Sequence, residues 1–373
     1  MKKIQVLKPY YRVDECLDEI RECLEIGWTG MGFKTNELED AWKKYTNLPN
    51  AYYVNSATSG LHVAFKLLKD EYKWDEKSEI ITTPFTFVST NHAIVYENMK
   101  PVFADVDDSL NLDPKSVEDK ITPNTKAIIF VGIAGNANNL LEIIQIAKEH
   151  NLKIILDAAH MAGSKIDGKH VGFDVDVTVF SFQSVKNMPT ADSGMVCFAN
   201  EKLDKKSRIV SWLGINKDTY SRSNEGTYKW YYDVSDVGYK YHGNSVMASL
   251  GLVALKYLDQ DNARRREITE AYIECLRDKV KYIQHENCTS SRHLFQIVVE
   301  NREDVIEHLQ ASGIYPGVHY VDNTYYEPYS ADENICSKSR YYSDRVLSLP
   351  LHLEMTQEDI QYVSQKVLEA LDA

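Results

Sequence analysis

An alternation of short apolar segments with longer amphipathic stretches, between residues 50 and 200, constrains the fold most. The apolar segments are rich in β-branched residues, and the intervals between them are long enough for crossover helices. Strands joined in this way pair in parallel and are buried on both faces. We therefore predict an α/β fold with a mostly parallel sheet. Its strands are expected at Glu79–Ile81, Pro101–Ala104, Ala127–Val131, Lys153–Leu156, Val175–Phe182 and Met195–Phe198.

Helical signals lie in and before this region. Apolar residues recur at helical spacing within Leu140–Ala147. Earlier, Asn36 and Glu39 have the spacing of a capping box at the start of a helix that carries Leu38 and Trp42. Both segments are therefore predicted to be helices.

The pattern changes after about Gly243, where long helical stretches replace the alternation. Helices are predicted at Val246–Leu258, Arg264–Val280, Asp304–Gln310 and Thr356–Ala373, the last capped by Thr356 and Asp359, with a strand at Leu294–Val299. We predict a large α/β domain over residues 1–243 and a smaller α+β domain over residues 244–373. The N-terminal stretch, roughly residues 1–25, is expected to pack on the small domain.

Composition excludes several classes of function. The net charge is -13 and the calculated pI is about 5.4, which disfavours binding to a nucleic-acid backbone. No stretch of roughly 20 apolar residues indicates a membrane span, and the N-terminus has no signal-peptide pattern. The six cysteines form no CxxC pair, so no zinc site or disulfide framework is indicated. We expect a cytoplasmic protein that needs no metal.

A cluster of small residues, Ser56–Gly60, precedes the apolar helical stretch Leu61–Leu68. The free N–H groups and the positive dipole end at the start of a helix favour a phosphate. Ser and Thr are also common N-caps, so this segment alone leaves both interpretations open.

Three further residues are candidates for chemistry. Asp157 ends a predicted strand, at the sheet edge where α/β folds bind ligands, and its carboxylate can hold a cation or a protonated ring nitrogen. Lys186 follows the strand Val175–Phe182, where partial desolvation would lower its pKa and make its amine a nucleophile. A turn or helix cap at Asp157, a structural histidine at His160 and an ordinary solvated lysine at Lys186 are the alternatives.

Seven segments in order resemble the sugar aminotransferases of the DegT/DnrJ/EryC1/StrS family, over nearly the whole chain. They are Gly27–Gly32, Asn55–Phe65, Thr82–Thr90, Lys100–Asp107, Asp157–Gly163, Phe180–Asn187 and Gly238–Ser245. The resemblance implies a fold like that of aspartate aminotransferase (fold type I), with helices on both faces of the large sheet. It also implies a homodimer with shared active sites and pyridoxal 5′-phosphate (PLP) as cofactor.

The resemblance also implies roles for individual residues. Lys186 would hold PLP covalently and move protons as a base, Asp157 would pair with the pyridine nitrogen, and His160 would flank the cofactor ring as a third catalytic residue. The remaining cofactor contacts are a stacking Phe87, the phosphate-binding residues Ser56, Ala57, Thr58, Ser59 and Ser181, and His242 reaching the partner's cofactor phosphate. Substrate-binding candidates are Trp28, Thr29, Met31, Arg222, Tyr228, Lys229 and His319. For Arg222, Tyr228 and Lys229, packing in a dimer interface is the alternative. His319 is a candidate together with Tyr320, for the substrate wall, and ordinary loop packing is the alternative for both.

The chain departs from the family pattern in three places. Ala191–Gly194 stands where members have Gly-Glu-Gly-Gly, Gly132 replaces the usual His after Val131, and His242–Ser245 differs from the usual continuation. We expect these changes to affect substrate and turnover more than cofactor binding.

The expected reaction is transfer of an amino group, from glutamate, to a nucleotide-linked keto sugar for polysaccharide or glycan synthesis. Members that act on 4-keto sugars tend to read Ser-Ala-Thr and Asp-Ala-Ala-His, as Ser56–Thr58 and Asp157–His160 do here, so a 4-keto-6-deoxyhexose is favoured. The alternatives are a 3-keto sugar, a PLP-dependent sugar dehydratase and a non-catalytic sensor. Lys186 argues against the dehydratase, in which His replaces the lysine.

Overall fold

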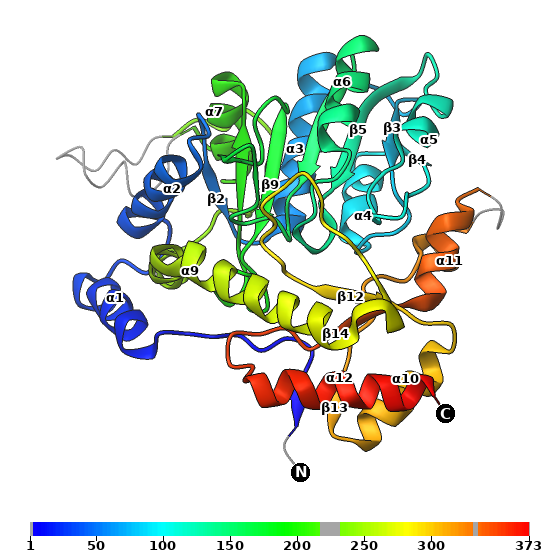
Figure 1. Ribbon diagram of the computed structural model, residues 1–373. Helices are drawn as coiled ribbons and strands as arrows, with labels where there is room; N and C mark the ends of the chain where they lie inside the picture. The colour runs from blue at the N-terminus through cyan, green and yellow to red at the C-terminus, as the bar shows by residue number, and fades with distance from the viewer. Residues whose placement is uncertain (1–2, 217–231, 331–334, 373) are drawn as a thin grey trace.

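The central element is a seven-stranded sheet with the strand order β2-β10-β9-β6-β5-β3-β4 (Figure 1). The computed structural model describes residues 3–216, 232–330 and 335–372. The strands are β2 (Tyr52–Val54), β3 (Glu79–Thr82), β4 (Lys100–Phe103), β5 (Thr125–Val131), β6 (Lys153–Asp157), β9 (Val177–Ser181) and β10 (Gly194–Phe198). Within this sheet β10 runs opposite to the other six strands, which all point in one direction. The predicted mostly parallel α/β sheet is confirmed.

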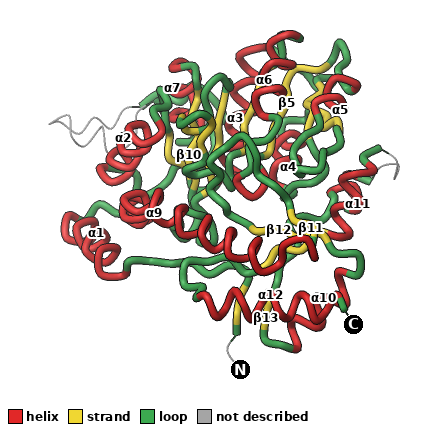
Figure 2. The backbone as a smooth tube through the Cα atoms, in the orientation of Figure 1, coloured by secondary structure: helices red, strands yellow, loops and turns green. Residues whose placement is uncertain are grey.

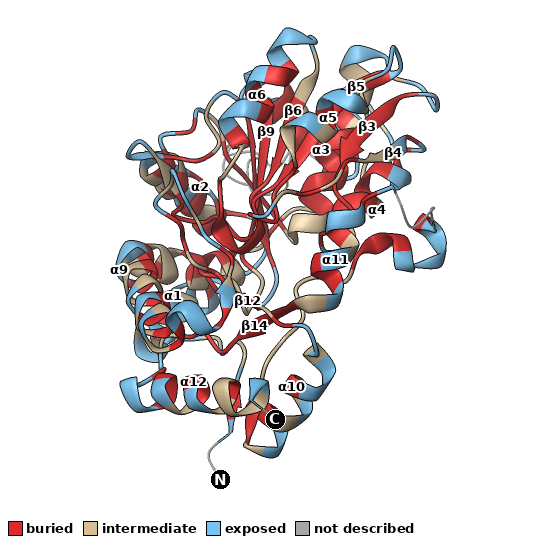
Figure 3. Ribbon diagram, turned by 45° about the vertical axis from the view of Figure 1, so that its right-hand side comes forward, coloured by how far each residue is buried: buried red, intermediate tan, exposed pale blue. Residues whose placement is uncertain are grey.

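Successive residues of each central strand point into different cores. Ile155 of β6 belongs to one apolar cluster and Leu156 to the other, and both side chains are fully buried. Figure 3 shows the central strands in the colour of buried residues. One face is covered by α2 (Phe33–Thr46), α5 (Pro114–Asp119), α6 (Leu140–Glu149) and α9 (Ser245–Leu276), the other by α3 (Ala57–Tyr72), α4 (Ser89–Tyr96) and α7 (Glu201–Val210). A strand buried on both faces reads as a continuous apolar run, which is why β3, β4, β5, β6, β9 and β10 could be predicted, whereas the three-residue strand β2 was not predicted.

A separate apolar core lies in the C-terminal part, drawn in the lower half of Figure 1. Its elements are a sheet of β11 (Lys281–Tyr282), β12 (Phe295–Val298) and β14 (Val346–Leu349) with α10 (Arg302–Ala311) and α12 (Gln357–Leu371). β1 (Ile4–Gln5) pairs in parallel with β13 (Ile314–Tyr315), and α1 (Val13–Ile26) packs on α9. The predicted strand at Leu294–Val299 and the helix at Asp304–Gln310 are confirmed.

The remaining elements are short (Figure 2). They are β7 (Lys165–Ile166), β8 (Lys169–His170), α11 (Ser337–Arg345) and the 3-10 helices η1 (Ile133–Gly135), η2 (Arg277–Lys279), η3 (Asn323–Tyr325) and η4 (Glu327–Tyr329). No helix within the described ranges is long and apolar enough to cross a membrane. Asn244, directly after the predicted domain boundary, N-caps α9. The division at residue 243 stays a prediction.

Two local predictions are wrong. The two helices expected at Val246–Leu258 and Arg264–Val280 are one continuous helix, α9, that ends at Leu276. The capping box at Asn36 and Glu39 does not form, because α2 already begins at Phe33. The Thr356–Asp359 capping box of α12 is confirmed.

Candidate active site

A pocket of about 470 Å³ opens at the carboxyl ends of the parallel strands, where α/β sheets bind their ligands. β5, β6 and β9 contribute Val131, Asp157 and Ser181, which lie at or near their last residues. The C-terminal part of the chain closes the pocket with His293, His319 and Tyr320. The other lining residues are Leu7, Ser56, Ala57, Thr58, Thr86, Phe87, Ser89, Thr90, Gly132, Ala159, His160, Gln183, Val185, Lys186 and Asp192.

Lys186 lies in this pocket, in the loop between β9 and β10. Its backbone N–H donates to the carbonyl of Gln183 at 2.8 Å, so a tight turn fixes where the side chain starts. Burial lowers the pKa of its amine to about 8, and the carboxylate of Asp157 partly offsets that effect. A substantial fraction of Lys186 is therefore neutral and nucleophilic at mildly alkaline pH.

Asp157 ends β6 and is buried at the base of the pocket. One carboxylate oxygen accepts from the hydroxyl of Thr90 at 2.8 Å and the other from the backbone N–H of Ala159 at 3.1 Å. Burial raises its pKa, while the two hydrogen bonds and Lys186 act in the opposite direction. The carboxylate is thus held in a fixed orientation, close to a positive charge.

The N-terminus of α3 forms one wall of the pocket. Ser56 is the N-cap and accepts from the backbone N–H of Ser59 at 3.1 Å. The Ser59 hydroxyl donates to Asn55 at 2.6 Å and does not line the pocket, whereas Ser56, Ala57 and Thr58 do. An N-cap and an anion site are therefore compatible in this segment, because the cap leaves Thr58 and free backbone N–H groups facing the pocket.

Several pocket residues were missed by sequence reasoning. They are Thr90, Gln183, Asp192 and His293. Thr90 lies in a segment that resembles the family, so it had a signal nearby, and Tyr320 was named with His319 as a candidate for the substrate wall. His293 had none, because it enters the pocket from a loop more than 100 residues after Lys186.

Other candidates lie outside the pocket lining. Trp28 donates from its indole N–H to the carbonyl of Met31 at 2.7 Å, in the exposed turn that contains Thr29. Arg222, Tyr228 and Lys229 fall outside the described residues.

His319 does line the pocket, with its Nδ1 2.9 Å from the hydroxyl of Ser348.

His242 also lies outside this pocket. Its Nδ1 hydrogen bonds to the carbonyl of Gly243 at 2.7 Å, and its ring packs edge-on against Trp212 at 4.5 Å. The expected reach into a partner's site stays a prediction.

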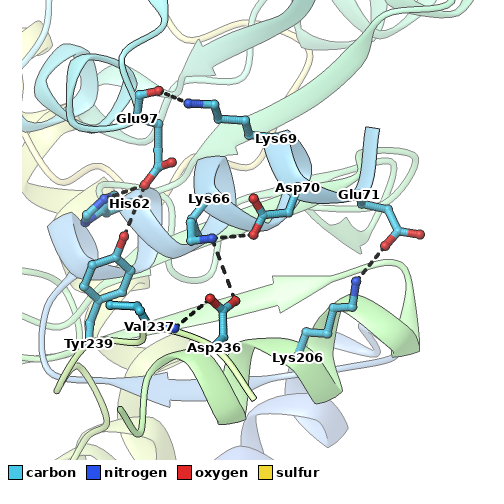
Figure 4. Close-up of polar contacts among 10 residues, drawn as sticks. All are labelled: His62, Lys66, Lys69, Asp70, Glu71, Glu97, Lys206, Asp236, Val237 and Tyr239. Carbon is cyan, nitrogen blue, oxygen red and sulfur yellow. Dashed lines mark hydrogen bonds and ion pairs between the residues drawn. The ribbon is translucent and has the colours of Figure 1, made fainter. Parts of the chain in front are cut away.

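The segment that leads to His242 is anchored on α3 and on the end of α4 (Figure 4). The carboxylate of Glu97 is hydrogen-bonded to Nε2 of His62 at 2.9 Å and accepts a hydrogen bond from the hydroxyl of Tyr239 at 3.3 Å. Lys66 pairs with Asp70 and lies 3.8 Å from Asp236. These buried and half-buried contacts fix the path of the chain just before His242.

Comparison with known proteins identifies the family. The family model described as "DegT/DnrJ/EryC1/StrS aminotransferase family" matches residues 11–368. The chain belongs to this family. As a member, it is 32% identical to the spore coat polysaccharide biosynthesis protein SpsC of Bacillus subtilis, over 95% of this chain and 93% of SpsC.

Solved structures of aminotransferases share the whole fold of this family member. The aminotransferase TlmJ from Streptoalloteichus hindustanus has a TM-score of 0.91, with 27% identity over 99% of both chains. The putative sugar aminotransferase Spr1654 from Streptococcus pneumoniae, in its PMP form, has a TM-score of 0.89, with 28% identity over 98% of both chains. The fold-type I architecture expected for the family is therefore confirmed.

The structure gives a physical reason for one departure from the family pattern and for one glycine that the chain keeps. A Cβ on Gly132 would lie 2.0 Å from the sulfur of Met161, so Met161 fills the space that a histidine side chain would need. In the changed turn before β10, a Cβ on Gly194 would lie 2.6 Å from the carbonyl oxygen of Phe180 and 2.9 Å from the backbone nitrogen of Ala57. The Gly at this last position is therefore retained for packing against α3.

The pocket fits the PLP implied by the family. It combines a lysine amine with a lowered pKa, a buried carboxylate, a helix N-terminus where Thr58 lines the pocket, and the half-exposed ring of Phe87. These are the groups that a covalently held, phosphorylated pyridine ring requires.

Proposed function

We propose that this protein transfers an amino group from an amino acid, L-glutamate, to a nucleotide-linked keto sugar, with PLP as its cofactor. The observation that carries the proposal is the meeting of Lys186 and Asp157 in one pocket beside the N-terminus of α3. The aminotransferase family to which the chain belongs, and its similarity to the putative sugar aminotransferase Spr1654, support the reaction class.

Each side chain has a distinct task. Lys186 would hold the cofactor. As a free amine it would then act as a base that takes a proton from the donor's Cα and as an acid that delivers a proton to the sugar carbon that receives the amino group. Asp157 would keep the ring nitrogen protonated, Thr58 and Ser181 would hold the phosphate, and Phe87 would cover the ring. When bound, PLP supplies the electron sink that makes the Cα proton acidic.

We infer that the acceptor is a 4-keto-6-deoxyhexose. Ser56–Thr58 and Asp157–His160 have the residue types that resemble 4-keto-sugar members, and both segments face the pocket. We further propose that the enzyme acts as a homodimer with His242 contributed to the partner's site. The product would be an amino sugar for a polysaccharide or glycan.

The test is a turnover assay with a labelled product. PLP-loaded protein and L-glutamate are incubated separately with 4-keto and 3-keto nucleotide-sugars, and NMR locates the new C–N bond. We expect amination at C4. Amination at C3 alone would overturn the 4-keto assignment, and no amination of any keto sugar would overturn the aminotransferase proposal. Borohydride reduction and peptide mapping should place the cofactor on Lys186 and on no other lysine.

A further inference from the structure

His160 is held in one protonation state by its own chain. Its Nδ1 accepts a hydrogen bond from the backbone N–H of Ala134 at 3.1 Å, in a buried position. A backbone amide can only donate, so Nδ1 must carry a lone pair. The neutral imidazole therefore carries its single hydrogen on Nε2.

That hydrogen is already used within the protein. Nε2 of His160 lies 3.1 Å from the hydroxyl oxygen of Tyr320. Because Nε2 is the donor, the hydroxyl oxygen accepts and keeps its own hydrogen free to donate. Within the ranges that the structure describes, this hydroxyl has no second hydrogen-bond partner, and Tyr320 lines the pocket beside Lys186.

The surroundings keep both groups in these states. Burial lowers the pKa of His160, and the positive charge of Lys186 and the nearby His319 act in the same direction. The ring of His293 lies 4.3 Å from that of His160, and burial lowers its pKa too. Burial and the Asp157 carboxylate raise the pKa of Tyr320, so its hydroxyl keeps the hydrogen.

The ring of Tyr320 is also fixed in position. It lies 5.9 Å from the ring of Phe87 and 5.9 Å from that of His160, nearly parallel to the latter at 26°. Tyr320 comes from the C-terminal part of the chain and His160 from the loop after β6, so the hydrogen bond joins the two sides of the pocket.

We propose that Tyr320, and not His160, donates the hydrogen bond to a ligand in this pocket, and that His160 is a positioning residue that orients the Tyr320 hydroxyl. The acceptor is an oxygen atom of the bound ligand near Lys186, on the cofactor or on the keto sugar. The identity of that ligand rests on the proposed function, whereas the hydrogen position on His160 does not.

The first test needs no cofactor. In the full ¹⁵N-labelled chain, long-range ¹H–¹⁵N spectra report which imidazole nitrogens carry hydrogen, and the His160→Gln variant identifies the signals of His160. We expect a protonated Nε2 and an unprotonated Nδ1 that do not change between pH 6 and 9. A hydrogen on Nδ1, or titration of His160 within this range, would overturn the proposal.

The second test uses Tyr320→Phe, with Tyr325→Phe as its matched control. The Tyr325 hydroxyl donates to Asp344 and lies outside the pocket lining. The probes are pyridoxamine phosphate, which binds without a covalent bond to Lys186, and the nucleotide-sugar, through its KM. We expect Tyr320→Phe to weaken the binding of one of these two probes by roughly threefold to tenfold, which is the effect of one hydrogen bond. Tyr325→Phe should weaken the binding of neither probe. The probe that is affected identifies the acceptor.

Two variants of His160 separate positioning from catalysis. Glutamine can accept from Ala134 and donate to Tyr320, so His160→Gln should retain more affinity for both probes than His160→Leu. His160→Leu can do neither and should lose as much affinity as Tyr320→Phe, with no further loss in the double variant. Wild-type affinity in Tyr320→Phe for both probes would overturn the proposal. A wild-type protein that binds no pyridoxamine phosphate would instead overturn the proposed function and the ligand role of Tyr320, while the NMR result on His160 would stand.

Discussion

The pKa of Lys186, a single residue, sets the pH range in which the pocket can react. Burial lowers this pKa to about 8, so the neutral amine becomes the major form above that pH, whereas an exposed lysine needs a pH above about 10.4. We predict that the rate of covalent PLP attachment to Lys186 rises with pH, reaches half of its maximum near pH 8 and then levels. Timed borohydride quenching and peptide mapping measure this rate. A rate that still rises steeply above pH 10 would contradict a desolvated Lys186.

Asp157 is expected to matter more for chemistry than for cofactor binding. Asp157→Asn keeps the size of the side chain but removes the charge that would hold a ring nitrogen protonated. We predict a loss of roughly 10²-fold to 10³-fold in kcat, with cofactor affinity changed much less. Thr90→Val removes the 2.8 Å hydrogen bond to Asp157 and the 3.0 Å hydrogen bond to the Thr86 hydroxyl but keeps the carboxylate, so it should lose less. Wild-type turnover in Asp157→Asn would show that the carboxylate is only a structural group.

Sequence reasoning about single residues is limited where the residues of one site lie far apart along the chain. Local patterns indicated the residues near strand ends or at a helix start, namely Asp157, Lys186 and Ser56–Thr58. The structure places all of them in the lining of the pocket. His293 reaches the same pocket from the C-terminal part of the chain, as do His319 and Tyr320, which the sequence named as candidates without showing what they contact. No local pattern encodes such a long-range contact, so only the folded structure brings them in.

At the scale of elements, the start of α2 shows why one cap was misplaced. Glu39 has the right spacing from Asn36, but its carboxylate is buried and accepts from the backbone N–H of Tyr53 at 2.9 Å and from Arg208 at 2.8 Å. The capping hydroxyl is that of Thr35, which accepts from the N–H of Gly32 at 3.1 Å and donates to its carbonyl at 2.7 Å. A tertiary role for Glu39 therefore took precedence over the local motif.

The corrected cap can be tested by two neighbouring substitutions. Thr35→Val leaves the buried N–H of Gly32 without a partner and should lower the free energy of unfolding by about 1–3 kcal/mol. Asn36→Ala, at an exposed position, should change it by less than about 0.5 kcal/mol. Urea unfolding of both variants measures the difference, and a larger effect at Asn36 would restore the original interpretation.

The continuous helix α9 was divided in prediction because polar residues interrupt its apolar pattern near residue 261. In the folded chain these residues are buried partners of distant segments. Asp261 accepts two hydrogen bonds from Arg12, at 3.0 and 2.7 Å, and Asn262 donates to the carbonyl of Ala162 at 2.8 Å. In the sequence, polar residues that make buried contacts of this kind look the same as the polar residues of a loop.

The Arg12–Asp261 pair should therefore contribute measurably to stability. Asp261→Asn removes the charge that Arg12 faces in a mostly buried, two-pronged contact, and we predict a loss of about 1–3 kcal/mol in the free energy of unfolding. Glu274 also lies on α9, in an exposed pair with Arg277 of η2, so Glu274→Gln is the control and should cost less than about 0.5 kcal/mol. Equal effects in chemical denaturation would mean that the buried pair stabilises no more than the exposed one.

At the scale of the whole molecule, the pocket depends on how distant parts of the chain meet. The large sheet supplies the strand ends and the N-terminus of α3, while the loops around His293 and Tyr320 close the opposite side. The pairing of β1 with β13 ties the start of the chain to the same C-terminal part. A parallel sheet is recognisable from sequence, but this mutual placement depends on contacts between surfaces that no local pattern specifies.

The proposed dimer extends the same reasoning to two chains. We predict that Lys186→Ala and His242→Ala are each inactive, and that mixing them with subunit exchange restores activity. A mixed dimer would contain one intact site, with Lys186 from one chain and His242 from the other, so a random mixture should regain about a quarter of wild-type activity. Ultracentrifugation should show dimers under the assay conditions. Because the His242 ring packs on Trp212 of its own chain, the alternative is a purely structural role. In that case the mixture would stay inactive, or His242→Ala alone would remain active, and either result would contradict a shared site.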